Sequence, residues 1–242
     1  MQRDKNMQHK TILFIVTSHA KISNTGKNTG LWLEELTTPY YAFKDAGYRV
    51  EIASITGGVV PIDPSSQKTI GQNPTSVDRF LQDKEVLAAI KNTPAISKID
   101  AKNYAAVFLP GGHGTMWDLP GSEKLAAIVS STLESGRVVA AVCHGPAGLV
   151  SAKDKKGQPV VKGRQVSAFT DAEEEAAGLT KTVPFLLESR LRELGALVKT
   201  GPNFQAFAIA DGNLITGQNP ASSEKVAALV IERLKSLDKK GA

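Results

Sequence analysis

The stretch Val138–Pro146 reads VVAAVCHGP and contains, in order, the signals of a buried strand, a tight turn and the start of a helix. Five consecutive apolar residues are typical of a strand that is covered on both faces. The residues His144, Gly145 and Pro146 then indicate a turn that leads into a helical segment. Cys143 stands at the tip of this turn, and such an elbow projects its side chain out of the end of a sheet.

Apolar runs and helical patterns alternate along the rest of the chain. Besides the strand before Cys143, strands are expected at 11–16, 49–54, 104–109 and 165–169. Helices are expected at about 31–46, 77–91, 122–135, 183–194 and 220–237. A hairpin is expected to turn at Asp211-Gly212-Asn213. Continuous apolar strands joined by helices indicate a parallel sheet covered on both faces, so we predict one α/β domain over residues 1–242.

The composition predicts a soluble cytoplasmic protein that binds neither nucleic acid nor membranes. The one cysteine cannot form an internal disulfide, which fits a reducing compartment. The apolar stretch Ile12–Val16 is too short for a signal-peptide core or a membrane span. The net charge is +5, but the basic residues are dispersed. Their densest group, within Lys153–Arg164, has no interleaved aromatic residues, so we interpret it as a solvated loop.

The position of Cys143 favours a reactive thiol over a buried, inert one. In a parallel α/β sheet the active crevice lies beyond the carboxyl ends of the strands, where this elbow is expected together with the loop after Val16 and the Gly111-Gly112 loop. Turn amides and a helix N-terminus favour negative charge at this point. A lone cysteine is otherwise most often a small buried hydrophobe.

A cysteine nucleophile needs a group that accepts its proton, because the ordinary thiol pKa is about 8.5. His144 is adjacent, and a turn allows its imidazole to approach the sulfur. A carboxylate from Asp171–Glu175 could orient that imidazole, although a solvated acidic helix start explains this segment equally well. Glu34 and Glu35 lie early in the first helix, where helical spacing directs only one of them inward; periodicity does not choose between them.

The loop Gly111-Gly112-His113 offers further candidates. Glycine allows backbone amides to approach a bound oxygen closely, so Gly111 and Gly112 could form an oxyanion hole with the amide of His144. His113 could contact the substrate or support a catalytic side chain, but a solvent-facing loop histidine is the more common case. No metal site is predicted, because the four histidines show no ligand spacing along the chain; they are His9, His19, His113 and His144.

Three motifs in this chain resemble one known superfamily. They are Pro110–Thr115 (PGGHGT), Ala140–Pro146 (AAVCHGP) and Thr216–Ser222 (TGQNPAS). These motifs are similar to those of the ThiJ/PfpI superfamily, which is class I glutamine amidotransferase-like. The chain is more narrowly similar to its heat-shock chaperone branch, the glutathione-independent glyoxalases or glyoxalase III. The resemblance implies a flavodoxin-like three-layer α/β/α sandwich and a homodimer.

The resemblance also implies roles for individual residues. It makes Cys143 the nucleophile and His144 the proton carrier. The acidic member of the triad matches Glu174, with Asp171 and Glu173 as competitors because the register slips easily among adjacent acids. The early glutamate follows a Thr-Gly-x-x-x-x-Glu pattern, which matches Thr29-Gly30 and selects Glu35.

The activity that the resemblance implies is conversion of methylglyoxal, or a similar 2-oxoaldehyde, to a 2-hydroxy acid such as D-lactate. No glutathione, nucleotide, metal or other cofactor would be required. Deglycation of proteins is a further implied activity. Two alternatives remain open: a holdase chaperone or redox-responsive stress protein acting on unfolded or glycated clients, and a cysteine amidase or peptidase.

Overall fold

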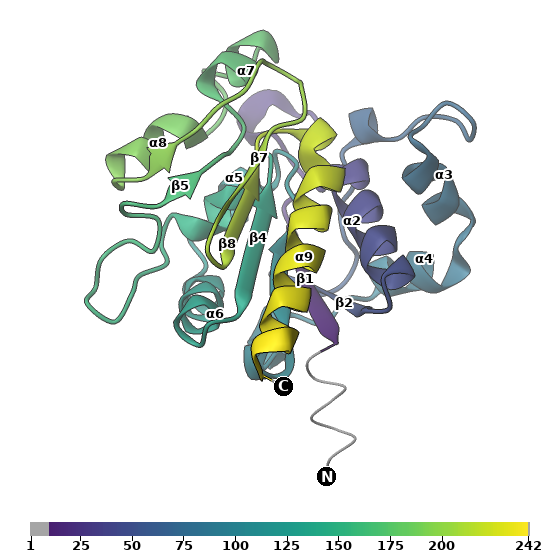
Figure 1. Cartoon of the computed structure of the whole chain (residues 1–242). Helices are drawn as coiled ribbons and strands as arrows, with labels where there is room; N and C mark the ends of the chain where they lie inside the picture. Colours follow the sequence, from purple (N-terminus) through teal and green to yellow (C-terminus); the bar gives the residue numbers. More distant parts are fainter. Residues whose placement is uncertain (1–9, 242) are drawn as a thin grey trace.

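A six-stranded sheet forms the middle layer of the molecule in a computed structural model that describes residues 10–241 (Figure 1). In spatial order its strands are β2 (Arg49–Ser54), β1 (Thr11–Val16), β3 (Ala106–Leu109), β4 (Val138–Val142), β8 (Leu214–Gly217) and β7 (Ala208–Asp211). All neighbouring strands pair in parallel except β7, which pairs antiparallel with β8 through the expected hairpin. The predicted flavodoxin-like, mostly parallel architecture is confirmed. His9 lies outside the described residues.

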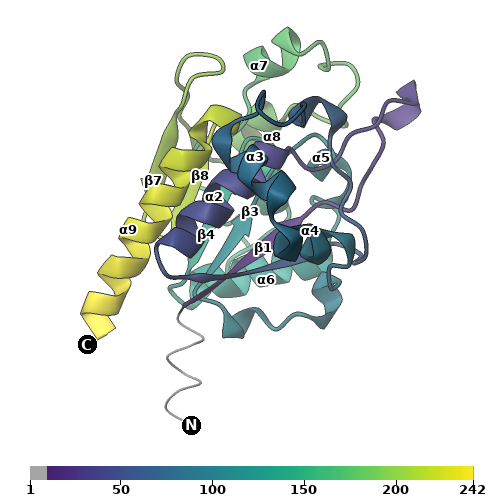
Figure 2. The ribbon, with the colours of Figure 1, turned by 90° about the vertical axis from the view of Figure 1, so that its right-hand side faces the viewer.

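Helices cover both faces of this sheet (Figures 1 and 2). One face carries α2 (Leu33–Asp45) and α9 (Ser223–Gly241); α3 (Thr75–Gln82) packs against α2, and α4 (Lys84–Lys91) packs against α3. The other face carries α6 (Glu123–Glu134) and the short α5 (Thr115–Asp118). Within the described part of the chain, no helix combines the length and the apolar character that crossing a membrane requires.

Alternate residues of the central strands enter two separate cores, as the twofold period of a strand requires. Phe14 on β1 packs under α2, whereas its neighbour Leu13 packs under the α6 layer. The Phe14 ring stacks on Phe108 at 4.7 Å and meets Phe43 of α2 edge-on at 5.8 Å. These buried aromatic contacts hold α2 against β1 and β3, and so hold the first turn of α2 at the carboxyl edge of the sheet.

The expectation of one helix over residues 77–91 is wrong, because the chain forms two helices there. Asp83 has extended backbone geometry and ends α3. Its side chain then accepts hydrogen bonds from the amides of Glu85 and Val86, and so caps α4. An aspartate that can bond to nearby amides competes with the continuing helix.

The strand expected at 165–169 is also shorter and lies elsewhere. Only Gln165–Val166 (β5) is extended, and it pairs with Leu197–Val198 (β6) in a separate two-stranded sheet. The chain then crosses the end of β4, where the Phe169 amide donates to the Cys143 carbonyl at 2.9 Å. This crossing delivers α7 (Asp171–Ala176) to the elbow, and α8 (Leu187–Glu193) follows it, beginning four residues later than expected.

Candidate active site

Cys143 occupies a left-handed turn directly after β4. Its φ angle is +60°, an unusual value for a residue with a side chain. Its amide donates to the Gly217 carbonyl at 3.0 Å, and its carbonyl accepts from Phe169, so both neighbouring segments hold this geometry. The following residues form a short 3-10 helix, Gly145–Leu149. The elbow expected from the sequence is present, and the thiol at its tip is 3% exposed.

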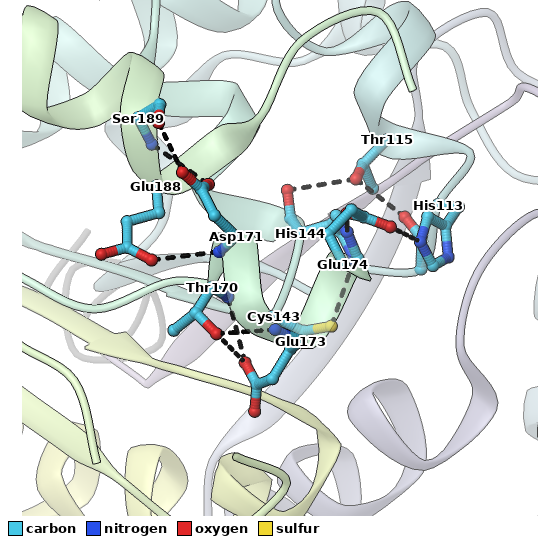
Figure 3. Close-up of polar contacts among 11 residues, drawn as sticks. His113, Thr115, Cys143, His144, Thr170, Asp171, Glu173, Glu174, Glu188 and Ser189 are labelled. Atoms are coloured by element: carbon cyan, nitrogen blue, oxygen red, sulfur yellow. Dashed lines mark hydrogen bonds and ion pairs between the residues drawn. The ribbon is translucent and has the colours of Figure 1, made fainter. Parts of the chain in front are cut away.

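The turn brings the side chains of Cys143 and His144 together although the residues are adjacent in sequence. His144 Nδ1 lies 3.3 Å from Cys143 Sγ, and His144 Nε2 lies 2.7 Å from Glu174 Oε2 (Figure 3). Glu174 is buried in the first turn of α7. A continuous hydrogen-bonded chain therefore runs from the sulfur through the imidazole to a carboxylate.

The start of α7 gives each of the three competing acids a different bonding partner. Thr170 caps the helix, and its side chain and the Glu173 carboxylate bond each other's amides in a capping box. Glu173 is thereby directed away from His144, and Asp171 bonds to Ser189 of α8 (Figure 3). Of the three, Glu174 contacts the imidazole. The alternative of a solvated acidic helix start is wrong for Glu173 and Glu174, which are both buried.

His113 contacts the same carboxylate from the other side. Its Nε2 lies 2.7 Å from Glu174 Oε1, and its ring centroid lies 4.1 Å from that of His144 (Figure 3). The His113 side chain is 12% exposed. The sequence left open whether His113 contacts the substrate, supports a catalytic side chain or faces solvent. Its bond to Glu174 had no signal in the sequence, because the two residues are 61 positions apart.

The protonation of this cluster follows from its hydrogen bonds. Burial alone would raise the pKa of Glu174, but the bonds from His113 and His144 outweigh it and lower that pKa to about 2. Burial, aided by the nearby His113, lowers the pKa of His144 to about 4 despite the carboxylate beside it. A neutral imidazole that donates from Nε2 to an ionised Glu174 leaves the Nδ1 lone pair facing the sulfur.

Glu35 approaches the elbow from the first turn of α2. It is fully buried, whereas Glu34 is partly exposed, so the inward residue is Glu35. Glu35 Oε2 accepts from the Gly111 amide at 2.7 Å. An added Cβ at Gly111 would lie 2.8 Å from that oxygen and 2.6 Å from the His144 nitrogen, so this close approach requires glycine. Within residues 10–241, Glu35 Oε1 has no hydrogen-bond partner.

Glu35 and Cys143 are both buried, and each affects the pKa of the other. Burial raises the pKa of Glu35 to about 8, although hydrogen bonding with Cys143 and Gly111 opposes this. Burial, the charge of Glu35 and its hydrogen bond also raise the pKa of the Cys143 thiol, and the His144 amide offsets only part of that. The negative charge that the turn was expected to favour is therefore not formed in advance. The thiol is therefore protonated, and His144 Nδ1 lies 3.3 Å from it.

The two glycines of the loop Gly111-Gly112 have different partners. The Gly111 amide is engaged by Glu35, which leaves the amides of Gly112 and His144 as candidates for an oxyanion hole. Gly112 has a φ angle of +98°, and an added Cβ would lie 2.2 Å from the Gly30 carbonyl oxygen. Gly112 therefore cannot carry a side chain without moving this loop.

One group of side chains at the site could hold a metal ion. The donor atoms of His113, His144 and Glu174 lie within 4.8 Å of one another. A divalent ion would have to replace the two 2.7 Å hydrogen bonds that now join them. Spacing along the chain does not indicate this group, because His113 and His144 come from two separate turns and Glu174 comes from α7.

Comparisons with known proteins add a family and several relatives. The model of the DJ-1/PfpI family matches residues 29–233. "Glyoxalase 3" of Candida albicans is 32% identical over 92% of this chain and 97% of its own length. The glutathione-independent glyoxalase hsp3101 of Schizosaccharomyces pombe is 34% identical over 95% and 98%.

Two solved structures are similar over nearly the whole chain. The crystal structure of glyoxalase III from Candida albicans has a TM-score of 0.84 and 32% identity, and the match covers 93% of this chain and 98% of that one. The Rapid Encystment Protein of 24 kDa from Francisella tularensis has a TM-score of 0.89 and 38% identity, with 93% and 99% covered.

Proposed function

The chain belongs to the DJ-1/PfpI family, and from this premise we propose that it is a glutathione-independent glyoxalase. It would convert methylglyoxal and related 2-oxoaldehydes to 2-hydroxy acids, D-lactate in the case of methylglyoxal. The observation that carries this proposal is the chain from Cys143 Sγ through His144 to Glu174, with the protonatable Glu35 coupled to the same sulfur. The relatives that bear this name align over nearly their whole length.

The first step joins the substrate to the enzyme. His144 Nδ1 accepts the thiol proton as Cys143 Sγ attacks the aldehyde carbon, C1, and a hemithioacetal forms. The imidazolium that results is stabilised by the ionised Glu174. Negative charge that develops on the former aldehyde oxygen would be met by the Gly112 and His144 amides.

The second step is an internal redox change. A base removes the proton from C1 while the ketone oxygen at C2 is protonated, which gives an enediol. A proton is then added at C2 and the oxygen on C1 loses its proton, which gives a thioester: C1 has been oxidised and C2 reduced. The raised pKa of Glu35, about 8, suits a carboxyl that must both give and take a proton near neutral pH. Water then cleaves the thioester, releasing the 2-hydroxy acid and restoring the thiol.

Wild-type protein tests this proposal directly. It is expected to form D-lactate from methylglyoxal in buffer without glutathione, and an enzymatic D-lactate assay measures it. Absence of lactate would overturn the proposal. Release of amine from peptide substrates in its place would support the amidase or peptidase reading. A cytoplasmic homodimer belongs to the same proposal and stays a prediction.

Glu174→Gln tests the acid of the triad against its exposed neighbour Glu175. A glutamine has one acceptor oxygen, so one of the two imidazoles must lose its donor contact. If this is His144, its Nδ1 carries a proton toward the sulfur and cannot act as a base. We expect kcat to fall roughly 10²- to 10⁴-fold in the lactate assay. Glu175→Gln is expected to stay within about twofold. Loss of activity on Glu173→Gln but not on Glu174→Gln would move the role to Glu173.

A further inference from the structure

Glu173, the neighbour of the proposed triad acid, joins three distant segments through its carboxylate. The side chain is fully buried. Its Oε1 accepts hydrogen bonds from the Phe204 amide at 2.7 Å, Asn219 Nδ2 at 2.8 Å and Gln218 Nε2 at 3.0 Å. Its Oε2 accepts from the amide and hydroxyl of Thr170. Five donors thus converge on one buried carboxylate, which links α7, the segment after β8 and the loop 201–207.

The Gln218-Asn219 pair belongs to the TGQNPAS motif, which the proposed mechanism leaves without a role. Both side chains also bind the loop 201–207 directly. Gln218 Oε1 accepts from the Gly201 amide at 2.8 Å, and Asn219 Nδ2 donates to the Gln205 carbonyl at 2.9 Å. The loop contains little regular structure, yet its backbone is held at several points along its length. It can therefore present a side chain in one position.

That side chain is Phe204. Its φ angle is +57°, an unfavourable value for a bulky residue, and its bond to Glu173 holds it there. The side chain is nevertheless among the most exposed of the large apolar residues described, at 52%. A strained backbone that presents an aromatic ring to solvent has no evident benefit to folding, so the conformation calls for a functional explanation.

The Phe204 ring stands at the outer end of a row of rings that begins at the active site. Its centroid lies 6.2 Å from that of Phe169, and the Phe169 centroid lies 4.4 Å from that of His144. His144 in turn contacts the sulfur. The loop that carries Phe204 runs beside α7 at the carboxyl edge of the sheet (Figure 1). The row therefore leads from the reacting thiol to solvent and is apolar at its outer end.

We propose that the loop 201–207, clamped by Glu173, forms an apolar wall of the substrate entrance, and that Phe204 is a specificity-determining residue. The inference rests on the proposed function and narrows its substrate class. A 2-oxoaldehyde bound through C1 to the sulfur carries its substituent beyond C2, away from the reacting atom. Phe204 favours 2-oxoaldehydes whose substituent is aromatic or otherwise apolar over glyoxal, which has none.

The test compares kcat/KM for glyoxal, methylglyoxal and phenylglyoxal. Phe204→Ala is expected to lower the value for phenylglyoxal roughly 10- to 100-fold and to leave glyoxal within about twofold. Phe204→Leu should retain an intermediate preference. Ile70→Ala is the matched control, because Ile70 is a similarly exposed apolar residue, at 57%, on a different loop. In that variant the ratios among the kcat/KM values of the three substrates should be unchanged.

Glu173→Gln tests the clamp as a positioning residue. Glutamine presents at most one acceptor oxygen to the five donors, so the Phe204 loop is released. The ratio of phenylglyoxal to glyoxal activity should fall as in Phe204→Ala, which a loss of folded protein alone would not produce. An unchanged ratio in both variants would overturn the proposal. So would a change in oligomeric state on Phe204→Ala without a change in ratio, which would place Phe204 between copies of the chain.

A second measurement does not depend on turnover. Cys143 is the only thiol of the chain, so its alkylation can be followed with iodoacetamide and with N-phenylmaleimide. Phe204→Ala should slow the reaction with the aromatic reagent relative to the small one. Wild-type protein that forms no lactate but shows this dependence would overturn the glyoxalase function and keep the apolar wall. If wild-type protein forms lactate but Phe204→Ala leaves the relative rates of the two reagents unchanged, the apolar wall alone would be overturned.

Discussion

Cys143→Ala is expected to abolish formation of D-lactate from methylglyoxal, with a fall in kcat/KM of at least about 10⁴-fold. No hemithioacetal can form without the sulfur, and no other thiol exists in the chain to replace it. Alanine and cysteine face a similar steric cost at the φ of +60° found in the elbow, so the backbone should be preserved. Stopped enzymatic assay of D-lactate, with glutathione absent, measures the effect.

The matched control is the stability of the same variant. Removing one buried sulfur atom should change the free energy of unfolding by no more than about 2 kcal/mol, measured by urea denaturation. A variant that folds and still turns methylglyoxal over within tenfold of wild type would exclude Cys143 as the nucleophile. Suppression of client aggregation that is unimpaired in Cys143→Ala would show a holdase activity independent of the thiol.

Glu35→Gln is expected to lower kcat for methylglyoxal roughly 10²- to 10⁴-fold, because an amide cannot carry a proton between C1 and C2. Glu34→Gln is the matched control on the same helical turn, and its partly exposed side chain should tolerate the change within about twofold. Alkylation of Cys143 by iodoacetamide separates loss of proton transfer from loss of the nucleophile. The rate in Glu35→Gln should be no lower than in wild type, and the comparison is sharpest above pH 8, where the wild-type Glu35 carries a negative charge beside the sulfur and glutamine does not.

The same substitution changes how stability depends on pH. The pKa of Glu35 is raised to about 8 in the folded protein from an ordinary value of 4.5, so the folded state binds this proton more tightly than the unfolded state. The wild-type free energy of unfolding therefore falls as pH rises from about 4.5 to 8, by on the order of 5 kcal/mol from this group. In Glu35→Gln this side chain cannot ionise, so this fall in the free energy of unfolding is absent.

We therefore expect Glu35→Gln and wild type to have similar stability near pH 5, and the variant to be more stable near pH 9. Urea unfolding at the two pH values measures the difference. Parallel stability curves would show that Glu35 ionises freely in the folded protein. In that case the proposed proton transfer through a raised carboxyl pKa would lose its basis, even if the loss of activity were observed.

Much of the site could be predicted because its signals are local in sequence. A short apolar run predicts the strand before Cys143, and the following His144-Gly145 predicts the turn. The Gly111-Gly112 pair likewise indicates a close backbone approach. Local patterns failed where a side chain ended an element: Asp83 divides a periodic apolar pattern into two helices. They failed again at 165–169, where most of an apolar run crosses the sheet end without joining a strand.

The assignment of acids to partners was not accessible from the residues alone. Periodicity left Glu34 and Glu35 open, and three adjacent candidates in α7 look alike in sequence. Family resemblance selected Glu35 and Glu174; in the structure Glu35 is buried beside Gly111, and Glu174 contacts His144. The family resemblance did not indicate that Glu173 accepts hydrogen bonds from five donors, or that His113 bonds the second oxygen of Glu174.

By itself, the sequence determined the parallel α/β layers and the thiol at the tip of an elbow, because strand burial and turn chemistry depend on neighbouring residues. The tertiary structure decided which carboxylate meets which group, and at what pKa. Glu35 meets Gly111 across 76 positions, His144 meets Glu174 across 30, and Glu173 meets Asn219 across 46. Desolvation and hydrogen bonding between such distant segments set the protonation of the site, and no local pattern records them.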